Sequence, residues 1–373
     1  MPTPTKPAFG GTRCPQRYGP WGLLLAALAA LLLSLAYLQK ALLSLALTVE
    51  FLSDGAFPAL TYLTSAPIET SMTVAGTPAD LYRPRGGGPA PGLILVHGLV
   101  EEGRRDARLI QAARRLARSG LLVLVPDLPE LRRGRLRPED TREVVEAVRV
   151  LRRAPVAAPR LGLVGISVGA GPTLLAAADP AIRDEVDLVV TLGGYADAKA
   201  LVQYMLTGGA DRDLIRAFVL RNLDLFAPPA DQALLAAALT RSFEALDDPG
   251  LERRLTPSGR AVARLLTRRT PADVALALEA LPEEVQTLLR TLSPVQAIDG
   301  VRAPLLLIHG RGDPAIPYTE SQKLYAAARA RARLILLQVI GHVDPKVISL
   351  GDALGLTGDV LHLWGAAYTL LTL

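Results

Sequence analysis

The chain has 373 residues, of which 50% are apolar and 21% are charged, and its formal net charge is +5. This composition is too apolar for a disordered chain and too charged for a protein with several membrane spans. The single cysteine, Cys14, excludes an internal disulfide framework and any metal cluster built from cysteine ligands.

Most of the positive charge is arginine that alternates with apolar residues at helical spacing, as between Arg104 and Arg118. This pattern is typical of the solvated face of an amphipathic helix. The run contains no aromatic side chain on which the bases of a single strand could stack. We therefore expect no nucleic-acid partner.

Residues 1–20 form a basic, proline-rich tail, and the stretch from Trp21 to Gln39 contains no charge. The helix predicted over 21–49 is long enough to cross a hydrocarbon core of about 30 Å. The core of a signal peptide is usually shorter, so we expect an uncleaved anchor. The small residues Ser44 and Ala46 keep cleavage as the alternative.

The charges around this helix predict its orientation. Basic residues precede it, whereas Glu50 and Asp54 follow it. This asymmetry predicts a cytoplasmic N-terminus and an extracytoplasmic location for the rest of the chain, although Lys40 weakens it. Residues 50–65 are predicted to be a linker.

The next part of the chain alternates short apolar runs with amphipathic stretches. A hairpin comes first, and the later runs are continuous and rich in leucine and β-branched residues, as in strands buried on both faces. We expect an α/β fold with a mostly parallel, doubly wound sheet and right-handed helical crossovers. The predicted strands are 68–74, 79–83, 93–97, 121–125, 161–166, 186–192, 304–309 and 334–340.

Strand patterns are absent from 195 to 292, where apolar residues follow helical spacing. Thr270-Pro271 is typical of a helix start, with a cap and a first-turn proline. We interpret 195–292 as a helical cap inserted into a core formed by 66–194 and 293–373.

The sharpest local motif is Gly165-Ile166-Ser167-Val168-Gly169, between a predicted strand and a predicted helix. Serine is a weak nucleophile, so an enzyme must lift its hydroxyl clear of the sheet on a tight turn. Glycines on both sides permit that turn.

A nucleophilic serine needs a base, and the chain offers four histidines. His97, His309 and His342 each follow a predicted strand, at the edge where open α/β sheets place their sites. His362 lies in a predicted apolar helix, where a packing or surface role is expected.

A carboxylate must orient the base and stabilise its protonated form. Asp313 follows a predicted strand, 29 residues before His342. Asp344 is the competing partner, but two residues of separation make its approach to that imidazole awkward. Asp127 also ends a strand, where we expect it to brace a loop.

From about residue 66 to the C-terminus the chain resembles the α/β-hydrolase superfamily. The likeness rests on four motifs in order: His97-Gly98, the glycine-flanked serine, His309-Gly310-Arg311-Gly312-Asp313, and Gly341-His342. It is similar in layout to dienelactone hydrolases, which use cysteine as the nucleophile, and in triad order to prolyl oligopeptidases, which usually add a propeller. Ser167 therefore favours esterases and serine peptidases.

The resemblance implies Ser167 as nucleophile, His342 as general base and Asp313 as its orienting partner. It also implies an oxyanion hole formed by the backbone N–H groups of Val168 and Leu99. Glu101 and Glu102 depart from the family pattern, and we expect them to point to solvent or to pair with nearby arginines.

The sequence thus predicts a membrane-anchored serine hydrolase that cleaves carboxylic esters through an acyl-enzyme. The partners expected are a small, lipid-like ester substrate and the membrane, with no cofactor and no metal. The helical insertion is expected to roof the serine and form an apolar acyl pocket. An acyltransferase or a serine peptidase would use the same residues, and a non-catalytic binding protein with this fold is a further alternative.

Overall fold

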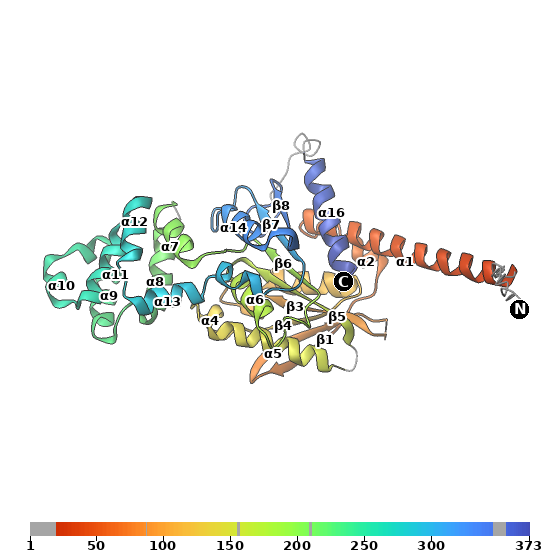
Figure 1. Cartoon of the computed structure of the whole chain (residues 1–373), viewed down its shortest axis with the longest axis horizontal. Coiled ribbons are helices and arrows are strands. Elements are labelled where there is room, and N and C mark those ends of the chain that lie inside the picture. The colour runs from red at the N-terminus through yellow and green to blue at the C-terminus, as the bar shows by residue number, and fades with distance from the viewer. Residues whose placement is uncertain (1–19, 87, 155–156, 209–210, 346–355) are drawn as a thin grey trace, which may run out of the picture. The chain divides into compact units, whose positions relative to one another are not determined.

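The computed structural model describes residues 20–86, 88–154, 157–208, 211–345 and 356–373, and it contains an eight-stranded sheet flanked by helices (Figure 1). The chain forms two compact units that divide between Leu42 and Leu43. Helix α1 (Pro20–Leu52) contributes to both. Residues 1–19 of the predicted tail lie outside the described residues.

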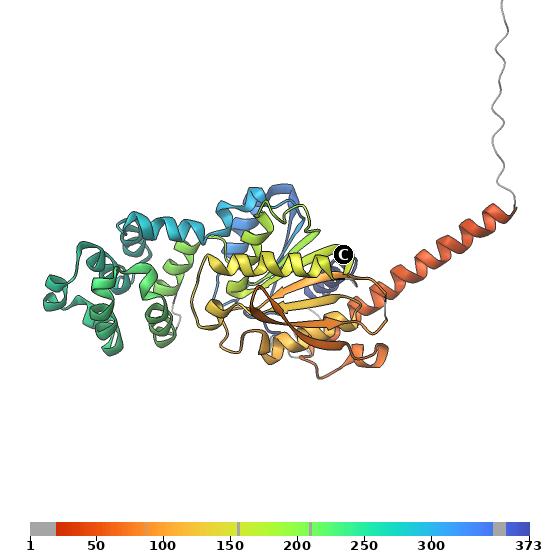
Figure 2. The same ribbon diagram turned by 90° about the horizontal axis from the view of Figure 1, so that it is seen from below.

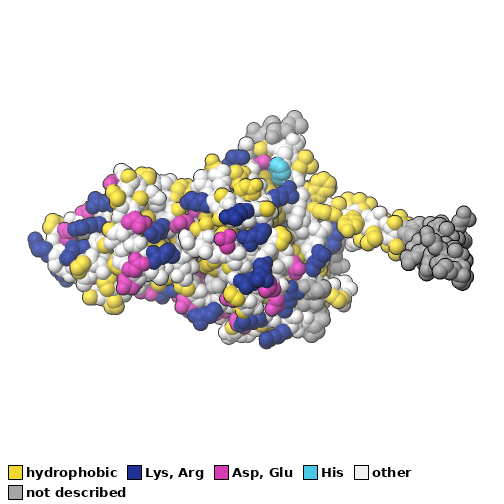
Figure 3. Space-filling view, viewed as in Figure 1, with side chains coloured by type: hydrophobic (Ala, Val, Ile, Leu, Met, Phe, Trp, Pro, Cys, Tyr) yellow, Lys and Arg dark blue, Asp and Glu magenta, His cyan; other side chains and the backbone are white. Residues whose placement is uncertain are grey.

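The part of α1 in the first unit carries apolar side chains that are exposed (Figure 3). The segment Leu28–Leu52 is long and apolar enough to cross a membrane. Counted from Pro20 to Leu42, the helix in this unit is about 34 Å long, close to the thickness of a hydrocarbon core. Its exposed large side chains are Leu28, Leu31, Leu32, Leu33, Leu35, Tyr37, Leu38 and Leu42.

The second unit is built on a sheet with the strand order β1-β2-β4-β3-β5-β6-β7-β8. The first two strands form an antiparallel hairpin, β2 pairs antiparallel with β4, and all other pairs are parallel. This confirms the predicted mostly parallel sheet. The strands are β1 Ile68–Val74, β2 Thr77–Arg83, β3 Ala90–Val96, β4 Leu122–Pro126, β5 Ala157–Ile166, β6 Leu188–Leu192, β7 Leu305–Gly310 and β8 Ala332–Leu337.

Successive residues of the buried strands face opposite sides of the sheet, as the pleat requires. In β3, Ile94 and Val96 pack into one apolar cluster, whereas Leu93 and Leu95 pack into another. The first cluster includes α5 (Glu139–Arg153), α6 (Ala170–Ala178) and α14 (Thr319–Ala328). The second includes α3 (Ala107–Arg118) and α16 (Thr357–Leu371). Helices therefore cover both faces, which explains the apolar strands.

The arginine-rich helix begins later than its charge pattern indicates. Arg104 and Arg105 lie in a short 3-10 turn, and α3 starts only after Asp106. The Asp106 carboxylate accepts hydrogen bonds from the backbone N–H groups of Arg108 and Leu109. This side-chain cap satisfies two free donors of the first turn and fixes the helix start.

Between β6 and β7 the chain forms a cluster of helices beside the sheet (Figures 1 and 2). These helices bury an apolar core of their own, which also includes Tyr195 and Ile316. The Thr270 hydroxyl caps α12 by accepting from the backbone N–H of Asp273. The helices are α7 Ala198–Thr207, α8 Arg212–Phe226, α9 Pro229–Arg241, α10 Pro249–Arg254, α11 Pro257–Thr267, α12 Pro271–Glu279 and α13 Glu283–Thr291.

The segment predicted as a linker, 50–65, belongs to the packed second unit. Helix α1 continues to Leu52, and α2 (Ala59–Leu63) follows. The buried Glu50 carboxylate accepts from the backbone N–H of Leu60 and pairs with Arg115 of α3 at 2.9 Å. The contacts of Glu50 thus connect the end of α1 to α2 and α3, which the sequence pattern does not reveal.

We predict that Glu50→Ala lowers the free energy of unfolding of the second unit by about 3 kcal/mol, because it leaves the Arg115 guanidinium buried without its partner. Chemical denaturation of the full chain in detergent measures this. The matched control is Glu69→Ala, which breaks the exposed pair with Arg114 and should cost less than about 1 kcal/mol. Equal losses for the two variants would contradict the assigned role of the buried pair.

Candidate active site

Ser167 sits on a sharp turn between β5 and α6. Its φ of 54° lies in the left-handed region, which residues with a side chain adopt at a cost of about 1–3 kcal/mol. The packing around the turn holds it there: the Thr173 hydroxyl donates to the Gly169 carbonyl at 2.7 Å. This tight turn places the serine hydroxyl at the carboxyl end of the sheet.

The flanking glycines are required by close approach. A Cβ at Gly165 would lie 2.6 Å from the Thr173 hydroxyl oxygen and 2.7 Å from the Ala170 Cα. A Cβ at Gly169 would clash with the carbonyl oxygen of His97. The turn can therefore pack against α6 and β3 only with glycine at both positions.

The structure brings Ser167, His342 and Asp313 together into one hydrogen-bonded chain. His342 Nε2 lies 2.6 Å from Ser167 Oγ, and His342 Nδ1 lies 2.6 Å from Asp313 Oδ2. An ionised carboxylate only accepts hydrogen bonds, so Nδ1 donates to Asp313. Nε2 is then left to accept the hydroxyl proton of Ser167.

Besides His342, Asp313 has several other hydrogen-bond partners. Its Oδ1 accepts from the backbone N–H groups of Ala315 and Ile316, and its Oδ2 lies 3.3 Å from His309 Nε2. Burial alone raises the pKa of this carboxyl, but the hydrogen bonds from His309, His342 and Ile316 outweigh it and lower the pKa to about 2. Asp313 is therefore an anion at neutral pH.

The two backbone N–H groups named from the sequence lie on the segments that flank the serine. Leu99 follows the end of β3, and Val168 is the next residue after Ser167. Within the described residues, neither N–H donates to a protein acceptor.

Ser167 and His342 line a pocket of about 250 Å³. Its walls come from the segment after β3, from α3, from the residues after His342, and from the end of α1 through Phe51. Among the described residues that line it, none belongs to the insertion over 195–292. The expectation that the insertion forms the pocket over the serine is therefore wrong.

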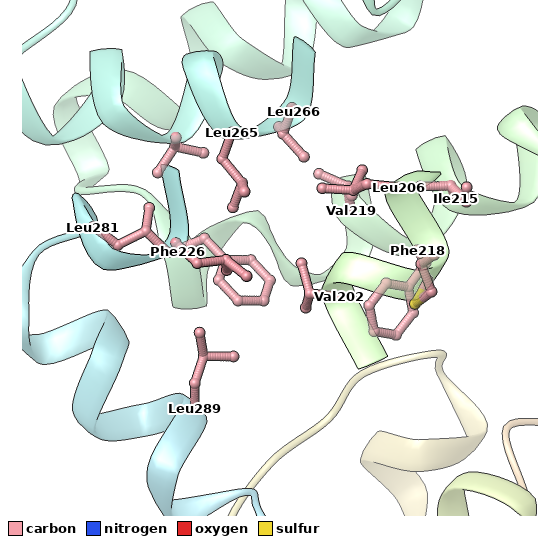
Figure 4. Close-up of a pocket in the computed structure, with 13 residues that line it drawn as sticks. Val202, Leu206, Ile215, Phe218, Val219, Phe226, Leu265, Leu266, Leu281 and Leu289 are labelled. Carbon is pink, nitrogen blue, oxygen red and sulfur yellow. The ribbon is translucent and has the colours of Figure 1, made fainter. Parts of the chain in front are cut away.

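The insertion encloses a separate apolar cavity of about 40 Å³ (Figure 4). Phe218, Phe226 and Leu289 are among its lining side chains, and all the lining residues are apolar. The helices of the insertion bury these side chains against one another. The leucine-rich pattern of 195–292 thus reflects the insertion's own apolar core.

The insertion does reach the rim of the site through polar contacts. Glu101 pairs with Arg221 of α8 at 2.8 Å, and both side chains are exposed. Glu102 is exposed as well, and Arg104 pairs with Asp80 rather than with either glutamate. The two carboxylates thus lie in solvent.

In the described part of the chain, the side chains of the remaining candidates pair with none of Ser167, His342 and Asp313. Asp127 is buried and accepts from the backbone N–H of Arg104, as a loop brace does. Asp344 pairs with Arg108 at 2.9 Å instead of with His342. His362 is exposed on α16.

His97 and His309 act as buried supports. Leu128 N–H donates to His97 Nε2, so His97 Nδ1 carries the proton and donates to the Gly98 carbonyl. Burial lowers the pKa of His97, which keeps the ring neutral. His309 holds Asp313, a role that the sequence analysis missed; the Ser321 hydroxyl on its Nδ1 comes from α14 and shows no local motif.

Comparisons with known proteins support the fold. A family model described as alpha/beta hydrolase fold matches residues 91–345. YfhR of Escherichia coli strain K12, described as an uncharacterized protein, is 51% identical over 49 residues, which span 13% of this chain and 17% of YfhR. This chain thus aligns with only a small part of that relative.

Among solved structures, Est1E from Butyrivibrio proteoclasticus matches with a TM-score of 0.49 and 14% identity, over 83% of this chain and 100% of that one. Acylaminoacyl peptidase from Pyrococcus horikoshii matches with a TM-score of 0.46 and 16% identity, over 83% and 41%. These likenesses are too distant to assign a substrate.

We predict a pH-dependent contribution of Asp313 to stability. Its pKa is about 2 in the fold against an ordinary value of 3.8, so the stabilisation is complete above about pH 4 and is lost as the pH falls through about 2. The difference in free energy of unfolding between wild type and Asp313→Asn should shrink by about 2 kcal/mol over that range.

Denaturant titrations at several pH values measure this difference. Asp299→Asn, at a carboxylate that is 91% exposed, is the control, and its difference from wild type should stay constant. A constant difference for Asp313→Asn as well would contradict the hydrogen-bonded anion described above.

Proposed function

The chain belongs to the alpha/beta hydrolase fold family, and on this basis we propose that it is a membrane-anchored serine hydrolase that cleaves carboxylic esters through an acyl-enzyme intermediate. The observation that carries the proposal is the hydrogen-bonded chain from Ser167 through His342 to Asp313. These three side chains come from positions up to 175 residues apart. Random packing rarely gives the order nucleophile, base and carboxylate.

In the proposed reaction, Ser167 Oγ attacks the ester carbonyl carbon while His342 Nε2 takes the hydroxyl proton. The carbonyl oxygen becomes an oxyanion that accepts from the N–H groups of Leu99 and Val168, each worth about 3 kcal/mol to the transition state. The C–O bond to the leaving group then breaks, and Nε2 returns its proton to the departing alcohol. A water repeats the sequence on the acyl-enzyme and releases the carboxylic acid.

Asp313 serves this reaction by staying ionised. When His342 takes the serine proton, its imidazolium lies 2.6 Å from a carboxylate whose side chain is excluded from solvent. The attraction is strong there because no water screens it. The carboxylate also fixes the ring so that Nε2 faces Ser167.

Membrane anchoring rests on α1. Ser44, Ala46 and Thr48 of this helix are buried within the second unit, and the Trp364 indole N–H donates to Ser44 Oγ at 2.9 Å. Cleavage at these small residues would cut a packed helix, which favours retention of the anchor. The charge asymmetry around the helix supports a cytoplasmic N-terminus with the hydrolase unit outside.

Two alternative functions, a serine peptidase and an acyltransferase, would use the same three residues for catalysis, whereas a binding protein would use none of them. A peptidase would attack an amide, and an acyltransferase would pass the acyl group to an acceptor other than water; product analysis with ester, amide and alcohol acceptor separates them. A purely binding protein would have no use for a serine held in a strained turn within hydrogen-bonding distance of an imidazole.

We predict that a fluorophosphonate labels the wild-type chain at Ser167 and that Ser167→Ala abolishes labelling. Loss of the nucleophile should lower ester hydrolysis on the order of a million-fold. Labelled peptides identified by mass spectrometry and initial rates on a p-nitrophenyl ester give the two readouts. Ser71→Ala, at a strand serine remote from the site, is the control and should retain both.

We also predict that Asp313→Asn lowers kcat by about 10⁴-fold, because the amide can stabilise neither the required tautomer nor the imidazolium. Asp344→Asn should leave kcat within about threefold, since Asp344 pairs with Arg108. The reverse ranking of these two variants would show that Asp344 is the orienting carboxylate.

A further inference from the structure

The pocket beside Ser167 has an unexpected wall, which is the end of the predicted anchor helix. Phe51, in the last turn of α1, lines the pocket, and Asp54 follows it there. Phe51 is half-buried and packs against the apolar cluster that covers one face of the sheet. The helix that would hold the chain in a membrane thus also shapes the space where the substrate would bind.

The pocket lining suits an uncharged, apolar group. Close to the serine it presents the side chains of Leu99, Ile166 and Leu192, and further apolar atoms come from α3 through Leu109 and Ala112. An apolar chain of an ester would be removed from water here, at a gain of about 0.8 kcal/mol for each CH₂ group.

The two arginines that line the pocket are already paired with carboxylates. Arg108 contacts both Asp106 and Asp344, and Arg115 contacts Glu50. The guanidinium groups therefore have their carboxylate partners within the protein. An anionic substrate would have to compete with those partners, whereas a neutral ester would not.

Phe51 lies in the last turn of α1, and the segment Leu28–Leu52 of this helix is long and apolar enough to cross a membrane.

The chain that follows α1 carries exposed apolar side chains of the kind found at membrane interfaces. Phe57, Tyr62 and Leu63 are 58%, 76% and 61% exposed. Aromatic and aliphatic side chains so placed bury themselves at the boundary between headgroups and acyl chains. This short segment starts three residues after Asp54, so it continues from the pocket wall.

We propose that the pocket takes the apolar chain of an ester presented at a lipid surface, and that Phe51 is the residue of α1 against which this chain packs. The proposal rests on the hydrolase function proposed above. It replaces the helical insertion, as the source of the acyl pocket, with the end of the anchor helix. The substrate class is then a neutral amphiphilic ester of the bilayer.

The test compares chain-length preference in matched variants of the full chain in phosphatidylcholine vesicles. The ratio of kcat/KM for p-nitrophenyl octanoate to that for the acetate should fall about tenfold in Phe51→Ala. Phe226→Ala, which removes the same side chain from the cavity of the insertion, should leave the ratio unchanged. A ratio that responds to Phe226→Ala and not to Phe51→Ala overturns the proposal.

Phe51→Trp covers the case in which the alanine variant does not fold. The larger ring keeps the contact with the apolar cluster but fills the pocket, so it should also lower the octanoate-to-acetate ratio. An unchanged ratio in this folded variant counts against the proposal.

A second measurement tests the lipid surface. The double variant Tyr62→Ser with Leu63→Ser should hydrolyse diacylglycerol in vesicles about tenfold more slowly while hydrolysing aqueous p-nitrophenyl acetate at the wild-type rate. Leu276→Ser, at a 73% exposed leucine of the insertion, is the control and should change neither rate. Equal diacylglycerol rates in the double variant and wild type would remove the lipid surface from the proposal.

The two proposals fail in distinguishable ways. Absence of fluorophosphonate labelling at Ser167 in the wild-type chain defeats the hydrolase function itself. If Ser167 is labelled and acetate is hydrolysed, but the octanoate-to-acetate ratio of kcat/KM does not respond to substitution of Phe51, only the assignment of the pocket is defeated.

Discussion

The site depends on one interaction, the charge-assisted hydrogen bond between the Asp313 carboxylate and His342. It exists because Asp313, though buried, receives hydrogen bonds from His309 and from two backbone N–H groups that outweigh the cost of burial. A carboxylate that took up a proton there would no longer hold the imidazole in the tautomer that faces Ser167. The support behind Asp313 is therefore as necessary to the arrangement as the three groups themselves.

The sheet makes this arrangement possible by placing the ends of its parallel strands along one edge. Ser167 follows β5, Asp313 follows β7 and His342 follows β8. Strands β5 and β7 are separated by β6, whose end at Leu192 also lines the pocket. Helices pack on both faces of the sheet and hold these strands in place. The loops that follow the strands, although far apart in the sequence, therefore meet at one edge of the sheet.

The structure separates two kinds of apolar surface that look alike in the sequence. The leucines of the insertion serve its own core, whereas the pocket at Ser167 is shaped by α3 and by the end of α1. In the proposed picture one helix therefore does two things: its first part sits in the bilayer and its last turn contacts the substrate. Anchoring and substrate selection would then be coupled through Phe51.

The sequence by itself predicted the succession of strands and helices along the chain, the glycine-flanked turn at Ser167, and Ser167, His342 and Asp313 as the candidate residues. These features could be predicted because the spacing of apolar residues, the position of a glycine and the chemistry of a side chain can be read locally in the sequence. It could not determine what lies across the pocket. The pairing of Asp344 with Arg108, the pairing of Glu50 with Arg115 and the packing of Phe51 against the cluster on the sheet all join residues far apart in the chain. Only the tertiary structure decides such contacts, since they depend on how whole elements dock rather than on any local pattern.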